Sequence, residues 1–307
     1  MFTYRRFTYY RFNIPSKLTL PPYSSVMHIS RYLDVSKKVD LAGIDFESAA
    51  KFPLHPDEIR CLTYMMDIES HTIVYLRGLL NTCAIEDPEI TAFLSCWAYE
   101  EFFHSRALRQ FLKACAEPVP APLATRVGLE EIATGLLCRF TPHLSAAYLT
   151  WGAIQELSTL EGYGLLANRT SNPVLAEILR RIIKDERRHF AFYFNKARLH
   201  LEPARARKLT SFLLRLFWTP VGEGVKPRNE TDWMLRCLFS DADGAKAAER
   251  IDATIRQLPG MEWFNMLSSR LSAGLAEAHP SDRQDLQSQW KAAAGYLKHQ
   301  PQRVEQM

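Results

Sequence analysis

Glu101-Phe-Phe-His104 and Glu186-Arg-Arg-His189 are two copies of one pattern, a glutamate followed three residues later by a histidine. Residues three apart lie on the same face of a helix, so each copy directs a carboxylate and an imidazole toward the same point. One copy is a weak signal, since a chain of 307 residues has a fair chance of containing it by accident. Two copies, each in the middle of a long helical pattern, indicate one shared site on facing helices.

Four long patterns of helical period contain these copies, and we expect helices over residues 57–81, 87–116, 142–168 and 172–200. The second and fourth begin with Asp87-Pro88 and Asn172-Pro173, a capping side chain followed by a first-turn proline. Short loops join the helices into two pairs, and a long segment, 117–141, crosses between the pairs and holds a shorter helical pattern over 128–140. Two hairpins joined by one long crossover predict an all-α, ferritin-like four-helix bundle.

The rest of the chain flanks this bundle. We expect an irregular N-terminal arm over residues 1–56, the bundle over 57–203, accessory C-terminal helices packed on it over 204–280, and a polar tail over 281–307. The accessory part shows helical patterns over residues 205–218, 230–239, 244–258 and 261–276.

Four glutamates interrupt the apolar stripes of the four long helices, one on each helix. Burying an unpaired carboxylate costs several kcal/mol even after relaxation, so four in one core require compensating positive charge. Two divalent metal ions supply it, and bundles of this kind use one Glu from each of two helices and Glu-x-x-His from the other two. The predicted ligands are Glu69, Glu101, His104, Glu156, Glu186 and His189. Such oxygen-rich ligation suits two iron ions per chain, with manganese or a mixed Mn/Fe pair as alternatives, better than zinc.

The acidic residues Glu100 and Asp185 each precede a ligand. A ligating histidine usually gives its other N–H to a carboxylate or carbonyl, so we expect Asp185 to support His104 and Glu100 to support His189. The alternative is that both are merely solvated neighbours. Glu161 is a less favoured third-helix ligand, because it lies off the apolar face that carries Glu156. His71 is two residues from Glu69 and should point elsewhere on its helix.

Composition and charge exclude several classes of protein. The net charge is only +4 and we find no strongly clustered basic footprint, which argues against nucleic-acid binding. None of the six cysteines forms a CxxC pair, which argues against a zinc ribbon or a thioredoxin-type site. Most of them lie in apolar helical patterns, where a cysteine is usually a small buried hydrophobic residue, so we expect reduced thiols in a cytoplasmic protein. No apolar stretch is long enough to span a bilayer.

Three segments resemble the iron-binding signatures of the soluble acyl-acyl carrier protein desaturases: Ala98-Tyr-Glu-Glu-Phe-Phe-His104, Gln155-Glu-Leu-Ser-Thr159 and Asp185-Glu-Arg-Arg-His189. The resemblance covers roughly residues 57–200. It implies a dimeric ferritin-like bundle that uses oxygen and a reduced ferredoxin-like donor to place a double bond in an acyl chain. It also implies that Thr159 assists oxygen activation or proton delivery, whereas a helix threonine can simply bond to its own backbone.

The same core is similar to the R2-like ligand-binding oxidases and to the small subunit of ribonucleotide reductase. Ile44-Asp45-Phe46 and Thr159-Leu160-Glu161-Gly162-Tyr163 carry this second likeness. The oxidases place a cross-linking tyrosine five residues before the third-helix glutamate, where this chain has Trp151. Arylamine N-oxygenases place an extra histidine four residues before the fourth-helix glutamate. This chain has Ile182 there, which argues against an arylamine N-oxygenase.

These observations predict an oxygen-dependent, dinuclear iron oxidoreductase that attacks a C–H bond of an apolar, acyl-type substrate. The alternatives are an R2-like oxidase or hydroxylase, and a ferroxidase or other iron-handling protein. The small residues Gly152 and Ala153, with Gly162 and Gly164, are expected to leave room for the substrate. A homodimer is expected from the resemblance. A basic run on the fourth helix is either a solvated face or a docking surface for an acidic carrier: Arg180, Arg181, Lys184, Arg187 and Arg188.

Overall fold

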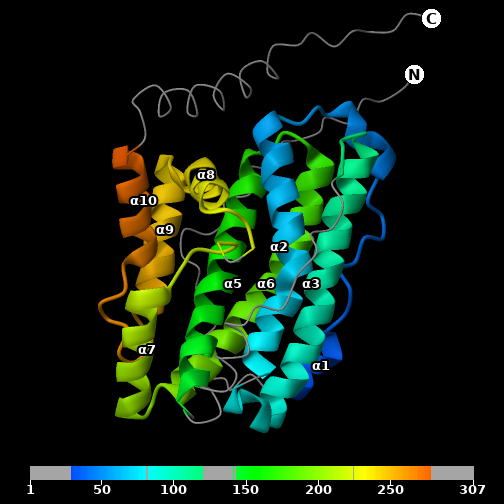
Figure 1. The fold of residues 1–307 in the computed structure, drawn as a ribbon. Coiled ribbons are helices and arrows are strands. Elements are labelled where there is room, and N and C mark those ends of the chain that lie inside the picture. The colour runs from blue at the N-terminus through cyan, green and yellow to red at the C-terminus, as the bar shows by residue number, and fades with distance from the viewer. Residues whose placement is uncertain (1–28, 81, 120–140, 142, 224, 278–307) are drawn as a thin grey trace, which may run out of the picture.

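The computed structural model describes residues 29–80, 82–119, 141, 143–223 and 225–277. All regular structure in these residues is helical and none of them forms a strand, so the predicted all-α class is confirmed (Figure 1). Four long helices form the bundle: α2 Pro56–Leu80, α3 Pro88–Ala114, α5 Leu144–Arg169 and α6 Pro173–His200. Each begins and ends within a few residues of its prediction.

The predicted caps set the starts of two bundle helices. The Asp87 carboxylate accepts hydrogen bonds from the backbone N–H groups of Glu89 and Ile90 at the start of α3. The Asn172 side chain accepts in the same way from Val174 and Leu175 at the start of α6. A short 3-10 helix, η2 Cys83–Glu86, joins α2 to α3, and three residues join α5 to α6. The bundle is therefore two antiparallel hairpins.

The long connection runs from the end of α3 at Ala114 to the start of α5 at Leu144. Its length agrees with the single crossover expected from the sequence. The helix predicted over residues 128–140 lies outside the described residues, as do residues 1–28 of the N-terminal arm and the whole of the 281–307 tail.

The segment before the bundle differs from its prediction. The sequence predicts an irregular segment through residue 56, yet this segment contains a short helix, α1 Ile29–Val35, and a 3-10 helix, η1 Phe46–Lys51. Both pack against the bundle, α1 on α3 and η1 on α3 and α6. Tyr32 of α1 is 1% exposed and its ring contacts Phe93 and Phe192. One anchoring aromatic in a seven-residue helix gives too little periodicity for a sequence pattern to reveal.

Of the four C-terminal helices, the first three lie against the outer side of α5, and the last packs on the two before it (Figure 1). The four helices are α7 Ala204–Phe217, α8 Arg228–Phe239, α9 Ala242–Ile255 and α10 Met266–Glu277. Arg169 at the end of α5 donates to the carbonyls of Cys237 and Leu238 and to the Asp241 carboxylate. These contacts fix the junction of α8 and α9 on the bundle.

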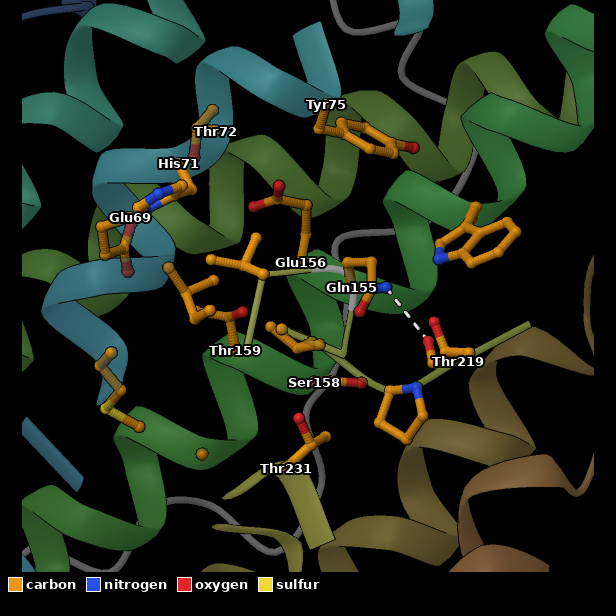
Figure 2. A pocket seen from close by; sticks show the side chains of 18 of the residues that line it. Glu69, His71, Thr72, Tyr75, Gln155, Glu156, Ser158, Thr159, Thr219 and Thr231 are labelled. Carbon is orange, nitrogen blue, oxygen red and sulfur yellow. Dashed lines mark hydrogen bonds between the residues drawn. The ribbon is translucent and has the colours of Figure 1, made fainter. Parts of the chain in front are cut away.

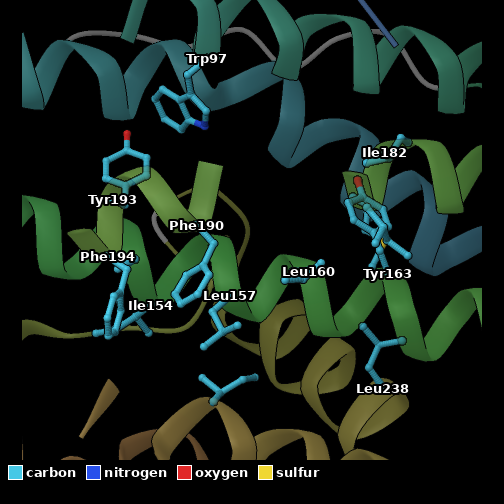
Figure 3. Packing of buried hydrophobic residues seen from close by; sticks show 14 of the residues in the cluster. Trp97, Ile154, Leu157, Leu160, Tyr163, Ile182, Phe190, Tyr193, Phe194 and Leu238 are labelled. Atoms are coloured by element: carbon cyan, nitrogen blue, oxygen red, sulfur yellow. The ribbon is translucent and has the colours of Figure 1, made fainter. Parts of the chain in front are cut away.

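Large apolar side chains fill the space between the helices (Figure 3). Phe93 and Phe192 stack with ring centroids 3.8 Å apart, and Trp97 meets Tyr193 edge to face at 5.5 Å. Gly152 of α5 lies directly under Tyr193, because a Cβ built on it would be 2.6 Å from that ring. The absence of a side chain at Gly152 thus lets α5 and α6 pack closely.

The five cysteines in the described residues are unbridged, and Cys138 lies outside those residues. Cys61 of α2 and Cys237 of α8 are both buried, with their sulfur atoms 3.5 Å apart. Their hydrogen bond, together with burial, raises the pKa of the Cys61 thiol well above its usual value. Within the described residues, no helix combines the length and the apolar character that crossing a membrane requires.

Candidate metal centre

All six predicted ligands point into the middle of the bundle. Glu69 comes from α2, Glu101 and His104 from α3, Glu156 from α5, and Glu186 and His189 from α6. Each is buried, and His104, Glu186 and His189 have no exposed surface. The three-residue spacing works as expected, since each Glu-x-x-His pair lies on one face of its helix.

The six side chains form two overlapping groups, in each of which one ligand atom per residue lies within 4.8 Å of the others. The first group is Glu69, Glu101, His104 and Glu186; the second is Glu101, Glu156, Glu186 and His189. Glu101 and Glu186 belong to both groups. The arrangement therefore offers two neighbouring cation positions that share two carboxylates, each with one terminal carboxylate and one imidazole.

The two imidazoles are oriented in the same way. His104 Nδ1 faces the first group, 3.1 Å from Glu186 Oε1, and His189 Nδ1 faces the second, 2.8 Å from Glu101 Oε1. On the other side of each ring, His104 Nε2 is 3.2 Å from Asp185 and His189 Nε2 is 2.8 Å from Glu100. An outer carboxylate holds the proton on Nε2, which leaves the Nδ1 lone pair free for a metal ion.

The buried Glu100 carboxylate is surrounded by donors. Besides His189, it accepts from the hydroxyls of Tyr32 and Ser36 at 2.7 and 2.9 Å, and from the backbone N–H of Lys37 at 3.1 Å. Burial acts to raise the pKa of Glu100, but its hydrogen bond and charge interaction with His189 and the bond from Tyr32 outweigh burial and lower it to about 2. Glu100 is therefore an anion held in place by donors from α1, from the two residues that follow it and from α6.

Arg188 connects the two outer carboxylates. Its guanidinium lies 2.8 Å from Glu100 and 2.7 Å from Asp185. The basic run on α6 is thus not one solvated face, because Arg188 turns inward and is only 24% exposed. Arg180 and Arg181 pair with Glu177, and Arg181 also binds the carbonyls of Asp40 and Ala42, while Lys184 and Arg187 are exposed.

Two further donors hold the terminal carboxylates. The Trp97 indole N–H donates to Glu156 at 3.1 Å, and the Tyr163 hydroxyl donates to Glu69. In the sequence both residues belong to apolar stripes, so nothing in the pattern reveals their polar atoms. Tyr32 and Ser36 were missed because they lie in a segment expected to be irregular.

The electrostatics of the cluster favour bound cations. Burial and the neighbouring Glu69 and Glu186 raise the pKa of Glu101 well above its usual value, and burial raises that of Glu156 to about 8. Burial also opposes ionisation of Glu186, but hydrogen bonds from His104 and His189 lower its pKa to about 2. Glu101, Glu156 and Glu186 carry their full negative charge together only beside added positive charge.

Buried polar atoms without a hydrogen-bond partner also indicate a site for cations. Buried atoms without an aligned hydrogen bond converge on the two groups: Glu69 Oε2, Glu101 Oε1, His104 Nδ1, both Glu186 oxygens and His189 Nδ1. Buried polar atoms normally have partners, so such a concentration calls for an explanation. Oxygen and imidazole donors of this kind fit iron or manganese, and the residues present therefore fit a two-metal centre.

The alternative ligands lie elsewhere. Glu161 is buried but belongs to neither group; its carboxylate accepts two hydrogen bonds from Arg250 of α9, at 2.6 and 3.2 Å. His71 also belongs to neither group, and its Nδ1 lies 2.6 Å from the Asp67 carbonyl.

A cavity of about 670 Å³ borders the centre and extends from it toward the C-terminal helices. Four of the six metal-site residues line it, Glu69, Glu101, Glu156 and Glu186. Its other walls come mainly from α2, α5, α7, residues 219–222 and 225, and α8, with Trp97 of α3 and Leu267 of α10. Figure 2 shows polar side chains from several of these elements around it, and Gln155 donates to the carbonyl of Thr219 across the cavity wall at 3.3 Å.

Over residues 70–215 the chain matches a family model described as fatty acid desaturase. This stretch is just under half of the chain and runs from α2 into α7, and it contains every predicted ligand except Glu69. No curated protein and no solved structure matches this chain. The match and the buried carboxylate and histidine cluster together support a fatty-acid-desaturase-like oxidoreductase.

The predicted substrate-pocket residues need correction. Gly152 and Ala153 do not line the cavity, since Gly152 faces Tyr193 on the packed side of α5 and Ala153 is fully buried. The face of α5 that borders the cavity carries Trp151, Gln155, Ser158, Thr159 and Gly162. Small residues on a helix allow close helix packing as readily as they leave space, and the sequence does not distinguish these uses. Thr159 does line the cavity, as its predicted role requires.

Proposed function

We propose that this chain is a dinuclear iron, oxygen-dependent oxidoreductase that removes hydrogen from the C–H bonds of an acyl-type substrate, as a desaturase does. The observation that carries the proposal is the cavity lined by Glu69, Glu101, Glu156 and Glu186, which opens an apolar space directly beside the two ligand groups. The desaturase match over residues 70–215 supports the same reaction class.

The bound metal ions would supply oxygen activation. The chain's own residues hold them: Glu69 and His104 at one position, Glu156 and His189 at the other, with Glu101 and Glu186 shared. Glu100 and Asp185 orient the two imidazoles through their Nε2 atoms, on the side of each ring away from the ligand groups, and Arg188 connects these two carboxylates. Thr159, beside the same space, is proposed to hold or deliver a proton at its Oγ1 atom.

The balance of the reaction requires an electron donor. Forming a double bond removes two hydrogen atoms from the substrate, and reducing one oxygen molecule to two waters takes these two hydrogens, two further electrons and two protons. We propose a ferredoxin-like protein as the source of those electrons. Apolar walls from α7 and α8 would exclude water and align the chain of the substrate beside the carboxylates.

Metal content and product analysis test this proposal. Protein loaded anaerobically with ferrous iron should retain about two ions per chain, as expected for this ligand set. With a reductant, oxygen and acyl substrates in free and carrier-bound form, the product should be lighter by two hydrogen atoms. Protein that takes up neither iron nor manganese would contradict the proposal.

Hydroxylation is the second candidate, since the same centre could insert one oxygen atom into the substrate; a product heavier by one oxygen identifies it. An R2-like oxidase would instead modify its own chain or retain a bound ligand. Assembly into a closed shell that accumulates a mineral core would identify an iron store.

A further inference from the structure

Helix α7 has an unusual composition for a helix that packs on the outside of a bundle. Its sequence from Ala204 to Phe217, ARARKLTSFLLRLF, contains four basic residues and no acidic one. It lies at the edge of the molecule, beyond α5 as seen from α2 and α3 (Figure 1). Only Ala206, Thr210 and Leu214 of this helix are buried.

The outward side of α7 combines positive charge with large apolar side chains. Helical spacing places Arg205, Lys208, Phe212, Arg215 and Leu216 on one side, which we call the α7 face. Phe212 and Leu216 are each 60% exposed. Arg205 and Lys208 are exposed and form no ion pair within the described part of the chain, and Arg215 stacks on Trp263 at 3.8 Å.

The same helix reaches the cavity beside the metal centre. Leu213 and Phe217 line that cavity, and Phe217 is 56% exposed. Phe217 is the one exposed side chain among the described residues that line the cavity. The cavity wall is therefore accessible to solvent beside the α7 face. An apolar molecule that enters the cavity at this point would pass from the outside of the protein into the cavity beside Phe217.

We propose that the α7 face docks on the surface of an anionic lipid bilayer, from which apolar molecules reach the cavity past Phe217. A helix with basic residues and exposed Phe and Leu suits the interface between headgroups and acyl chains, where both kinds of side chain are satisfied. A second copy of this chain is a poorer occupant, because a twofold contact would set the three bases of the α7 face against the same bases. An acidic protein would match the charges but leave Phe212 and Leu216 on a polar surface.

Vesicle co-sedimentation with the metal-loaded full chain tests the proposal. The protein should bind vesicles of phosphatidylcholine with phosphatidylglycerol, bind pure phosphatidylcholine much less, and lose binding as salt rises. Replacing the two bases of the α7 face other than Arg215, R205Q with K208Q, should weaken binding to the anionic vesicles by about 30-fold. Replacing the apolar pair, F212S with L216S, should weaken it by about tenfold or more. All four side chains are exposed, so the variants should keep the melting temperature of the parent protein.

Phe102→Ser is the matched control, because Phe102 of α3 is 53% exposed but lies away from α7. It should leave vesicle binding unchanged. Absence of vesicle binding, an equal loss in Phe102→Ser, or an α7 face that proves necessary only for self-association or for binding an acidic carrier would overturn the proposal. The readout is independent of substrate oxidation, so its failure and that of the proposed oxidoreductase are separate results.

Discussion

Arg188 shows how a single residue can act on both proposed metal positions without belonging to either ligand group. Its guanidinium bridges Glu100 and Asp185, and these two carboxylates orient His189 and His104. The pairing of each histidine with the acidic residue on the opposite helix was predictable from the sequence, because ligating histidines need such a partner. The bridge was not predictable, since Arg188 is one of five basic residues within nine positions and only its side-chain direction separates it from the others.

Replacing this arginine tests the bridge. Arg188→Gln should weaken metal binding by about 10- to 100-fold, the usual cost of losing such outer support. The position that uses His104 should suffer more, because Glu100 keeps its donors Tyr32 and Ser36. Titration with Mn(II) under anaerobic conditions measures both affinities. Arg187→Gln, the exposed neighbour, is the control, and equal affinities in the two variants would show that the bridge is not needed.

Replacing Thr159 tests the proposed proton transfer rather than metal binding. Thr159→Val keeps the shape of the side chain but removes the hydroxyl, so turnover should fall by about 100-fold if this group handles a proton, while the iron content stays unchanged. Ser158→Ala is the control, because Ser158 also lines the cavity but donates its hydroxyl to the Ile154 carbonyl. Equal turnover of Thr159→Val and the parent protein would remove Thr159 from the mechanism.

At the scale of the elements, the long helices are readable from the sequence and the shape of the space between them is not. Asp87 and Asn172 mark their helix starts by local hydrogen bonds, which need no knowledge of the rest of the fold. The cavity wall depends on α7 and α8, whose approach to α5 is set by packing and by Arg169. The sequence therefore does not show which face of α5 borders the cavity, and Gly152, which it predicts to line a pocket, does not border this one.

Two of the three glycines of α5, Gly152 and Gly164, give opposite predictions. Gly152→Ala should destabilise the protein by about 1–3 kcal/mol, because its Cβ would overlap the Tyr193 ring. Gly164→Ala meets nothing within 4 Å and should instead stabilise the protein by up to about 1 kcal/mol through helix propensity. Denaturant unfolding of the metal-free protein measures both. Stabilisation by both substitutions would show that α5 and α6 do not pack closely at Gly152.

At the scale of the whole molecule, the buried cluster makes stability depend on pH and metal together. Burial raises the pKa of Glu156 to about 8, against an ordinary value of 4.5. Burial acts to lower the pKa of His104, but hydrogen bonds to Asp185 and Glu186 outweigh it and raise this pKa well above 6.5. The metal-free folded protein therefore binds more protons than the unfolded chain around neutral pH, so its free energy of unfolding falls as pH rises through about 8.

Metal binding should reverse this trend. Ligands must lose their protons to bind a cation, so the affinity for Mn(II) should rise with pH over the same range. Thermal unfolding with and without Mn(II), at a series of pH values from 6 to about 8.5 around the pKa of Glu156, should show a stabilisation that grows with pH. Metal-free Glu156→Gln should show a weaker pH dependence than the metal-free parent. A stabilisation that is independent of pH would mean that Mn(II) binds outside this cluster.

The division of the ligands between the two hairpins governs how the protein can open. Three ligands of one group lie on the α2–α3 hairpin and one on the α5–α6 hairpin, and the other group has the reverse division. Parting the hairpins therefore breaks both groups in a single event, and no partial opening between them frees one ion while keeping the other. Exchange of bound ions with an isotope in solution and deuterium uptake by the central turns of these helices should then proceed at one common rate.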